Sequence, residues 1–321
     1  MSMRADEVID RRRLRRKLSF WRVVAVGLIV LALAGAALWS LDPASYARWE
    51  KGAALDHIAR VKIEGTITED EDLLERLDAI AKADRVKGVI LSIDSPGGTT
   101  AGGEAIYEAV RKVAAHKPVV AQVGTLAASA GYMIASGADQ IVARQSSIVG
   151  SIGVLVQIPN FAGTLDKLGV RVDEVKSSPL KAEPSPFNET TEPERAMLRS
   201  MILDSYDWFV GLVAERRPLS REEVLALADG SIFTGRQALQ RKLVDKLGGE
   251  DEAKAWLVEK GVSADLEVVE WKPRNQGSFL LSAMGSLMKI AGLSDSLIEL
   301  SGRLGSDRMF LDGLVSVWQP E

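Results

Sequence analysis

The chain has 321 residues, of which 46% are hydrophobic, and a formal net charge of −4. This length and apolar content suffice for a folded core, which excludes an intrinsically disordered protein, and we expect no nucleic-acid partner. The absence of cysteine excludes disulfides and a cysteine nucleophile, and only two histidines, His57 and His116, exclude a histidine-rich metal site. We expect both histidines to lie at the surface, outside any catalytic role.

Residues 23–41 form an uncharged apolar run, close to the ~20 residues that span a bilayer core. Residues 1–22 are rich in arginine and lysine, so the positive-inside rule predicts a cytoplasmic basic segment followed by one transmembrane helix. A cleaved signal peptide is the alternative, but its apolar core is usually shorter, at ~7–15 residues. The anchor would contact lipid in the inner (cytoplasmic) membrane and leave the rest of the chain on the periplasmic or extracytoplasmic side.

After the anchor, residues 42–56 are predicted to be a juxtamembrane connector, residues 57–272 a folded domain, and residues 273–321 a C-terminal tail. We expect the tail to be flexible or to pack on the oligomer or the membrane. Strands are predicted at 58–67, 88–94, 119–123, 141–143, 149–156, 170–175 and 266–271. Helices are predicted at 70–83, 103–115, 130–136, 165–169, 192–216, 221–228, 235–243 and 251–260. This alternation predicts an α/β domain with a mostly parallel sheet and functional groups at the carboxyl ends of its strands.

Ser129 is the candidate nucleophile. It stands in the small-residue run Ala-Ala-Ser-Ala-Gly-Tyr at 127–132, after the apolar strand 119–123 and before the helix 130–136. Small neighbours leave room for a tight turn, and a strand-to-helix junction places a hydroxyl near the free N–H groups of a helix start. Taken alone, the motif fits a small residue in a packed turn equally well.

A serine nucleophile needs a base, and with histidine set aside lysine and carboxylates remain. Lys181 follows a predicted strand end and lies within the proline-rich stretch 179–186. An apolar setting would lower the pKa of its ammonium and let it take the proton of Ser129, whereas the alternative is a solvated loop lysine. The hydroxyl of Ser151, in a Gly-Ser-Ile-Gly run, could hydrogen-bond the neutral lysine and orient it.

An oxyanion hole is predicted where the strand 88–94 ends in the Ser-Pro-Gly-Gly turn at 95–98. Gly97 and Gly98 allow backbone N–H groups to point outward. We expect the N–H of Gly98, together with that of Ala130 after the nucleophile, to hold a developing oxyanion. A Pro-Gly-Gly run is also compatible with a plain turn.

Taken in order, these motifs resemble the signal peptide peptidase A family over roughly residues 58–257. They are IDSPGG at 93–98, AASAGY at 127–132, GSIGV at 150–154, KSSPLK at 176–181, ADG at 228–230, TGRQAL at 234–239 and LVDKLGG at 243–249. The resemblance implies a membrane-anchored serine endopeptidase with a Clp protease/crotonase-like fold of repeated ββα units. Its nucleophile would be Ser129, its general base Lys181, its lysine-orienting residue Ser151 and an oxyanion donor Gly98.

The same resemblance implies that the substrates are signal peptides and other unfolded apolar peptides. It also implies an octameric ring whose neighbouring subunits assemble the Ser/Lys dyad, and no metal or organic cofactor. The family often has two glycines after the nucleophile, whereas this chain has Ala130 and then Gly131. Alanine is strained there if residue 130 needs a positive φ and favourable if residue 130 begins a helix, which is the interpretation we prefer.

Two other classes of function remain open at this stage. A crotonase-type acyl-thioester enzyme would share the fold and the glycine-rich turn, but the anchor and the pairing of Ser129 with Lys181 would have no explanation. A catalytically silent membrane scaffold that binds peptides would carry the same motifs. Loss of activity in Ser129→Ala and Lys181→Ala, with the assembly intact, would separate a peptidase from a scaffold.

Overall fold

The computed structural model describes Trp21, residues 55–272 and residues 315–317. The predicted transmembrane helix at 23–41 and most of the predicted tail therefore lie outside the described residues. Among the described residues, no helix is both long enough and apolar enough to cross a membrane. The described residues from 55 onward belong to one compact unit.

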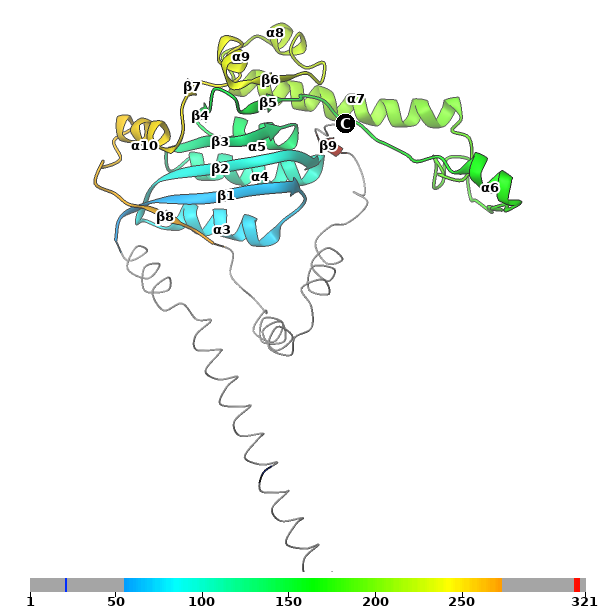
Figure 1. The fold of residues 1–321 in the computed structure, drawn as a ribbon, viewed down its shortest axis with the longest axis horizontal. Helices are drawn as coiled ribbons and strands as arrows, with labels where there is room; N and C mark the ends of the chain where they lie inside the picture. The colour runs from blue at the N-terminus through cyan, green and yellow to red at the C-terminus, as the bar shows by residue number, and fades with distance from the viewer. Residues whose placement is uncertain (1–20, 22–54, 273–314, 318–321) are drawn as a thin grey trace, which may run out of the picture. The chain divides into compact units, whose positions relative to one another are not determined.

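A mostly parallel sheet forms the centre of this unit (Figure 1), with nine strands in the described part of the chain. The main order is β6-β5-β3-β2-β1-β8, with β4 also beside β3, β7 beside β4 and β9 beside β2. Only β5–β6 and β2–β9 are antiparallel among the described pairs. The bounds are β1 (His57–Ile67), β2 (Val86–Thr99), β3 (Val119–Ala128), β4 (Gln140–Ala143), β5 (Ile148–Gly150), β6 (Ile232–Thr234), β7 (Lys246–Leu247), β8 (Val268–Glu270) and β9 (Val315–Val317).

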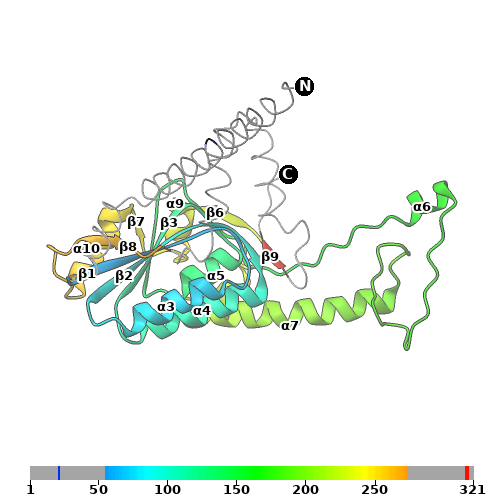
Figure 2. The ribbon, with the colours of Figure 1, turned by 90° about the horizontal axis from the view of Figure 1, so that it is seen from below.

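Helices cover both faces of the sheet. Figure 2 shows α3, α4, α5 and α7 on one side of it, whereas α10 packs on the other. The bounds are α3 (Glu71–Lys82), α4 (Thr100–Ala114), α5 (Ala130–Ser136), α6 (Ala162–Leu168), α7 (Glu192–Arg216), α8 (Arg221–Leu225), α9 (Gly235–Gln240) and α10 (Glu250–Glu259). The structure is therefore of the mixed α/β class with a mostly parallel sheet, as predicted.

The near-continuous apolar runs of the central strands follow from burial on both faces. Along β3, Val119 and Ala121 point into the larger core beneath α3, α4, α5 and α7, whereas Val120 between them points into the smaller core with Trp256 and Leu257 of α10. All three β3 residues are fully buried. Because successive side chains of a strand alternate between faces, this pattern needs a helix layer on each side.

Most predicted helices and strands are confirmed to within a few residues, but three strands differ. β2 continues to Thr99 instead of turning at 95–98, because β1 keeps pairing with it as far as Gly98. The ladder shifts register beside Pro96, which has no N–H to donate. The strand predicted at 149–156 ends at Gly150, and the one predicted at 170–175 does not form.

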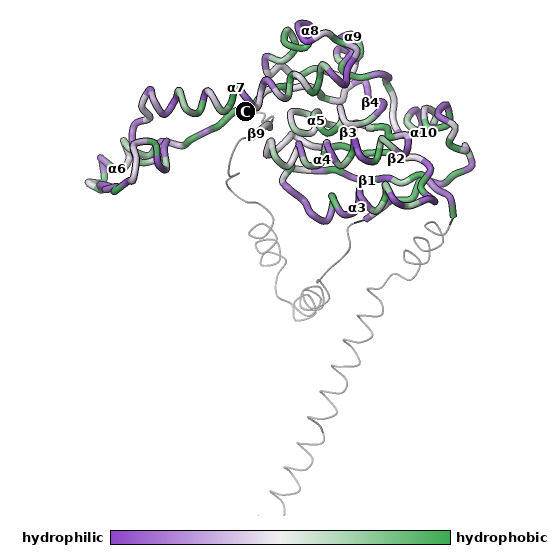
Figure 3. The backbone as a smooth tube through the Cα atoms, turned by 180° about the vertical axis from the view of Figure 1, so that it is seen from behind, coloured by the Kyte–Doolittle hydropathy of each residue, from purple (hydrophilic) through white to green (hydrophobic). Residues whose placement is uncertain are grey.

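Residues 156–191, which we call the arm, extend away from the sheet together with the first part of α7 (Figures 1 and 2). Figure 3 shows hydrophobic segments along the arm as well as in the sheet. The large apolar side chains that the arm exposes are Phe161, Leu168, Val170, Val172, Val175, Leu180 and Phe187. The sequence 170–175 alternates like a strand, but no neighbouring strand is there to pair with it.

Candidate active site

Ser129 lies at the junction between β3 and α5, as predicted. Its backbone has φ 57° and ψ −119°, a conformation that residues with a side chain rarely adopt, and its side chain is buried. Its N–H donates to the carbonyl of Gly150 at 2.8 Å, and its own carbonyl accepts from the N–H of Met133 at 2.9 Å. A strained serine at a strand-to-helix turn is the geometry of a nucleophile elbow.

Three neighbouring strands end beside this serine. The register pairs Ser95 of β2 with Ala127 of β3, and Ala128 of β3 with Gly150 of β5. Ser129 follows Ala128 and Ser151 follows Gly150, so each serine comes directly after a residue of the pair that ends the β3–β5 ladder. Ser151 is also buried and has a positive φ of 51°, and its N–H donates to the carbonyl of Ser231 at 2.8 Å.

The glycine pair forms the end of β2 and not a separate turn. Gly97 has a φ of 106°, which favours glycine, and its N–H donates to the hydroxyl of Ser95 at 3.1 Å. A Cβ on Gly98 would lie 1.9 Å from the carbonyl oxygen of Ile67 in β1, so only glycine permits this approach. The N–H of Gly98, the predicted oxyanion donor, thus belongs to a backbone segment that is held tightly at the carboxyl edge of the sheet.

Ser95 is a residue of the site whose role the sequence did not reveal. It is fully buried, and its hydroxyl donates to the carbonyl of Gly65 at 2.6 Å while it accepts from Gly97. One hydroxyl therefore joins β1 to the glycine pair. In the sequence, Ser95 could have been noticed as a serine near the end of an otherwise apolar strand.

Ala130 is the first residue of α5, and the positive φ falls on Ser129 before it. The interpretation that alanine is favourable here because it begins a helix is confirmed. The N–H groups in the first turn of a helix have no acceptor within that helix, which is the property that an oxyanion donor needs. A Cβ on the next residue, Gly131, would lie 2.9 Å from the carbonyl oxygen of Ser95, so α5 packs closely on β2.

Lys181 lies in the arm, apart from the other predicted site residues. Its side chain is exposed, and the segment between α6 and α7 that contains it lies at the outer end of the arm (Figures 1 and 2). Among the described residues, no hydrogen bond or ion pair involves its ammonium group. The apolar setting expected for Lys181 is therefore not present within a single chain.

The arm does hold a second lysine in place. Lys176 pairs with Glu174 and Glu183, and these hydrogen bonds raise its pKa above the usual 10.5. The hydrogen bond from Lys176 in turn lowers the pKa of Glu183, whose carboxylate also accepts from the N–H of Ser185 at 2.6 Å. These contacts join the two sides of the loop that presents Lys181.

The prediction that both histidines are exposed is wrong for His57. This residue is buried because Trp271, after β8, stacks on it and donates from its indole N–H to Nε2 at 3.1 Å. His116 is exposed, as expected. His57 begins β1 and His116 precedes β3, so both lie at the amino ends of parallel strands, opposite the edge that carries Ser129.

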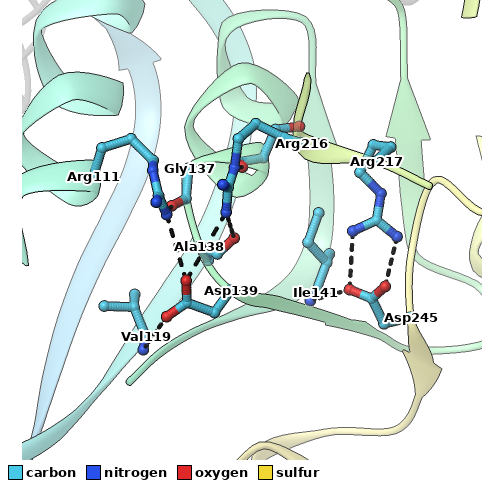
Figure 4. Close-up of polar contacts among 10 residues, drawn as sticks. Arg111, Val119, Gly137, Ala138, Asp139, Ile141, Arg216, Arg217 and Asp245 are labelled. Atoms are coloured by element: carbon cyan, nitrogen blue, oxygen red, sulfur yellow. Dashed lines mark hydrogen bonds and ion pairs between the residues drawn. The ribbon is translucent and has the colours of Figure 1, made fainter. Parts of the chain in front are cut away.

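A polar cluster ties the far ends of β3 and α5 together (Figure 4). Arg216, the last residue of α7, donates to the carbonyls of Ser136 at 3.1 Å and Ala138 at 3.2 Å, just where α5 ends. Arg111 of α4 donates to the carbonyl of Gly137 at 2.9 Å. Both arginines approach Asp139.

Asp139 completes this cluster from the strand side. Its carboxylate accepts from the N–H of Val119, the first residue of β3, at 3.1 Å. β3 and α5, which meet at Ser129, are therefore also joined at their other ends, where β3 begins and α5 ends.

A second ion pair fixes the neighbouring chain. The guanidinium of Arg217 donates to both carboxylate oxygens of Asp245, at 2.7 and 3.0 Å, and Asp245 also accepts from the N–H of Ile141 at 2.7 Å (Figure 4). Tyr132 of α5 donates to the carbonyl of Leu243 at 2.9 Å, and burial raises the pKa of its phenol. Among the described residues, no cluster of three or more His, Asp or Glu is placed to hold a metal ion.

Two known families match the chain, and both matches include Ser129. The pattern of peptidase family S49 matches residues 111–263, and that of Clp protease matches residues 53–149. The chain is 41% identical over 207 residues to "Putative protease MJ0651" of Methanocaldococcus jannaschii, covering 64% of this chain and 67% of that protein. It is 38% identical over 201 residues to "Putative protease slr0021" of Synechocystis sp., covering 62% and 72%. It is 33% identical over 277 residues to "Putative signal peptide peptidase SppA" of Enterococcus faecium, covering 80% of each.

Proposed function

This chain belongs to peptidase family S49, the signal peptide peptidase A family, and from this premise we propose that it is a membrane-anchored endopeptidase that degrades cleaved signal peptides with a Ser129/Lys181 dyad. The observation that carries the proposal is the backbone of Ser129. A buried serine with a φ of 57° at a strand-to-helix turn has the backbone of a nucleophile elbow, and β2, which pairs with β3, carries the Gly97–Gly98 segment that would supply an oxyanion donor.

In the proposed reaction, Oγ of Ser129 attacks the peptide carbonyl while Nζ of Lys181 takes its proton. The N–H groups of Gly98 and Ala130 stabilise the oxyanion, and Lys181 then protonates the leaving amine. Water, deprotonated by Lys181, hydrolyses the resulting acyl-enzyme ester and restores Ser129. Ser151 would orient Lys181, since the register places it beside Ser129.

We infer that Lys181 reaches Ser129 in a neighbouring subunit and not in its own. The observations in support are the distance of the arm from the sheet, the exposure of Lys181 and the apolar side chains that the arm presents to solvent. A second copy that covered the arm would bury these side chains, and it would also desolvate Lys181, which lowers the pKa of an ammonium. A closed ring, in which each subunit contacts the next through a heterologous interface, would complete every site. The resemblance to the family implies a ring of eight subunits.

Mixing two inactive chains tests the dyad and its assembly together. Ser129→Ala and Lys181→Ala should each lose peptide hydrolysis by several orders of magnitude. When the two variants are unfolded together and reassembled, a shared dyad should recover about a quarter of the native activity, because random mixing pairs an intact Ser129 with an intact neighbouring Lys181 at that frequency. Each variant reassembled with itself is the control.

The outcomes separate the alternatives. Full activity in Ser129→Ala would eliminate the serine peptidase. If the native chain is active but the mixture of the two inactive variants recovers no activity, the dyad lies within one chain. A crotonase-type enzyme would act on an acyl thioester and not on a peptide, and a silent scaffold would bind an apolar peptide without hydrolysing it. An active Lys181→Ala chain would require another base.

The apolar run at 23–41 supports a single-pass anchor in the inner membrane, with the N-terminus in the cytoplasm and the peptidase domain on the periplasmic or extracytoplasmic side. Such an anchor would place the site close to the bilayer, where cleaved signal peptides are released. These apolar peptides fit the small, apolar residues around Ser129.

A further inference from the structure

β2 is irregular on both of its edges shortly before the glycine pair at Gly97–Gly98. On the β1 side, Gly65 alone stands where β2 has two residues, Ser95 and Pro96. The ladder with β3 shifts register at the same level, between Ile93 and Ser95. A bulge of this kind interrupts the ladder and re-aims the strand beyond it, often next to an active site. The backbone of the glycine pair is therefore not directed by regular pairing in the residues that precede it.

The hydroxyl of Ser95 takes the place of the hydrogen bonds that the bulge interrupts. Pro96 has no N–H, so it cannot donate to β1. Instead, the Ser95 hydroxyl donates to the carbonyl of Gly65 at 2.6 Å and accepts from the N–H of Gly97 at 3.1 Å. Ser95 is fully buried, and losing one partner of a buried hydrogen bond leaves the other unpaired. One side chain thus joins β1 to the glycine pair across the bulge.

The hydrogen bond from Gly97 also restricts the peptide that carries the proposed oxyanion donor. Two successive glycines have little conformational preference of their own, and Gly97 already has a φ of 106°. Fixing the direction of the Gly97 N–H removes one of the rotations by which the next peptide, with the Gly98 N–H, could turn. The close approach of Gly98 to Ile67 limits where this residue lies.

We propose that Ser95 is a positioning residue of the peptidase, which acts through Gly97 to direct the Gly98 N–H toward the oxyanion. The inference rests on the proposed function and deepens it, because it makes the rate depend on a buried side chain that does not contact the substrate. A donor stabilises the transition state only if it already points to where the negative charge develops. A small misplacement of such a group can cost about 10²-fold in rate.

Ser95→Ala in the full chain removes the hydroxyl and keeps the rest of the side chain. We expect kcat for an apolar peptide to fall about 10–100-fold and KM to change less than about twofold, because the donor acts in the transition state. In a peptide aldehyde, Oγ of Ser129 bonds to the carbonyl carbon, Lys181 takes the hydroxyl proton and the carbonyl oxygen becomes the oxyanion. The affinity for this aldehyde should fall by the same factor as kcat.

Ser147→Ala is the matched control. Ser147 is also buried, and its hydroxyl donates to the carbonyl of Gly124 at 2.6 Å and accepts from the N–H of Arg144 at 3.0 Å. The substitution therefore removes the same two kinds of hydrogen bond, but none to the glycine pair. This chain should lose stability as Ser95→Ala does and should keep the native kcat and the native affinity for the aldehyde.

Ser95→Thr and Ser95→Val separate the hydroxyl from the shape of the side chain. Both new side chains are β-branched and similar in size, so strain from the added methyl is common to them, and only threonine keeps a hydroxyl. The threonine chain should exceed the valine chain about tenfold in kcat and in affinity for the aldehyde.

The outcomes distinguish this inference from the proposed function. With an active native chain, native kcat and aldehyde affinity in Ser95→Ala, or equal values in Ser95→Thr and Ser95→Val, would overturn the positioning role alone. A native chain that hydrolyses no peptide and binds no aldehyde would overturn the proposed function, and this inference with it.

Discussion

The backbone of Ser129 is held in a conformation that costs about 1–3 kcal/mol for a residue with a side chain. Strain of this size persists only where the surrounding structure fixes the chain. Two hydrogen bonds do so directly, one to the carbonyl of Gly150 and one from the N–H of Met133. The close packing of Gly131 on Ser95 limits movement on the other side. The geometry of the elbow is therefore a property of three strand ends and α5 together.

Gly98→Ala should damage both this site and the sheet. The added Cβ would lie 1.9 Å from the carbonyl oxygen of Ile67, and because the obstacle is backbone, β1 and β2 must separate. We expect a loss of about 1–3 kcal/mol in the free energy of unfolding. Displacing the N–H of Gly98, the proposed oxyanion donor, should lower kcat by about 10²–10³-fold. Chemical denaturation and steady-state peptide hydrolysis measure the two effects.

Gly163→Ala is the matched control for the stability measurement. Gly163 lies in α6, where a Cβ would meet nothing within 4 Å. The free energy of unfolding of the Gly163→Ala chain should be unchanged or slightly higher than that of the native chain, because alanine favours a helix more than glycine does. A Gly98→Ala chain with native stability and native kcat would show that β1 does not constrain the glycine pair.

At the scale of single residues, the sequence predicted the position of Ser129 in the fold, because the small-residue turn between a strand and a helix is a local pattern. Ser129 follows β3 as predicted, whereas Ser151 was expected inside a strand and follows β5, and Gly98 was expected in a turn and lies in the last residues of β2. All three lie toward the carboxyl ends of parallel strands, which parallel pairing brings to one edge. Sequence reasoning failed for His57 because Trp271, which buries it, is 214 residues away in the sequence. No pattern near Lys181 could show that the arm carries it away from the sheet.

The unit that presents Ser129 is a strand and a helix joined at both ends. The elbow joins them at the top, and Arg111, Asp139 and Arg216 join them at the bottom (Figure 4). α5 has only seven residues, so it has few hydrogen bonds of its own to keep its direction. Arg216 also ends α7, the helix that follows the arm, and thus links that helix to α5, which begins directly after Ser129.

Arg216→Met should therefore slow the chemistry of Ser129 at a distance. Losing the two hydrogen bonds to the carbonyls of Ser136 and Ala138 should cost about 1–3 kcal/mol of stability. We expect the rate at which a fluorophosphonate labels Ser129 to fall about tenfold, with kcat for peptide falling in parallel and KM little changed. Arg216→Lys, which keeps a donor and the charge, should recover part of the rate.

Arg76→Met is the control for a purely structural effect. Arg76 in α3 also donates to a backbone carbonyl, that of Trp271 at 3.2 Å, and this carbonyl follows β8 and not α5. Arg76→Met should be less stable than the native chain but should be labelled at the native rate. Both variants, Arg76→Met and Arg216→Met, are to be measured well below their unfolding temperatures. Equal labelling rates in the native chain and in Arg216→Met would contradict a positioning role for Arg216.

At the scale of elements, the sequence predicted the helices and strands whose pairing strands or capping residues are near in the chain. α7 begins and ends at the predicted residues, with the carboxylate of Glu194 accepting from the N–H of Thr191 at 3.1 Å. β9 was missed because three residues carry no periodicity and pair with a strand more than 200 residues earlier. The expected strand at 170–175 shows the converse, since alternation without a neighbouring strand forms no ladder.

The whole chain presents more apolar surface on the arm than an isolated monomer would be expected to keep. Val175 is fully exposed at 104%, and Leu168 is 70% exposed. Several large apolar side chains exposed on one segment indicate an interface with another protein. The proposed function gives the arm a partner, a second copy of this chain, and links assembly to catalysis because the same arm carries Lys181.

Val175→Asp should therefore abolish assembly and activity together while the isolated chain remains folded. Since Val175 is fully exposed within its own chain, a charge there should leave the monomer's unfolding unchanged, but it would be buried unpaired in an interface. Light scattering in detergent should show a smaller species, and peptide hydrolysis should be lost. Val258→Asp, at a valine of α10 that is 38% exposed, is the matched control and should remain assembled and active. If Val175→Asp kept both its native size and its activity, the arm would not be the surface that joins the subunits.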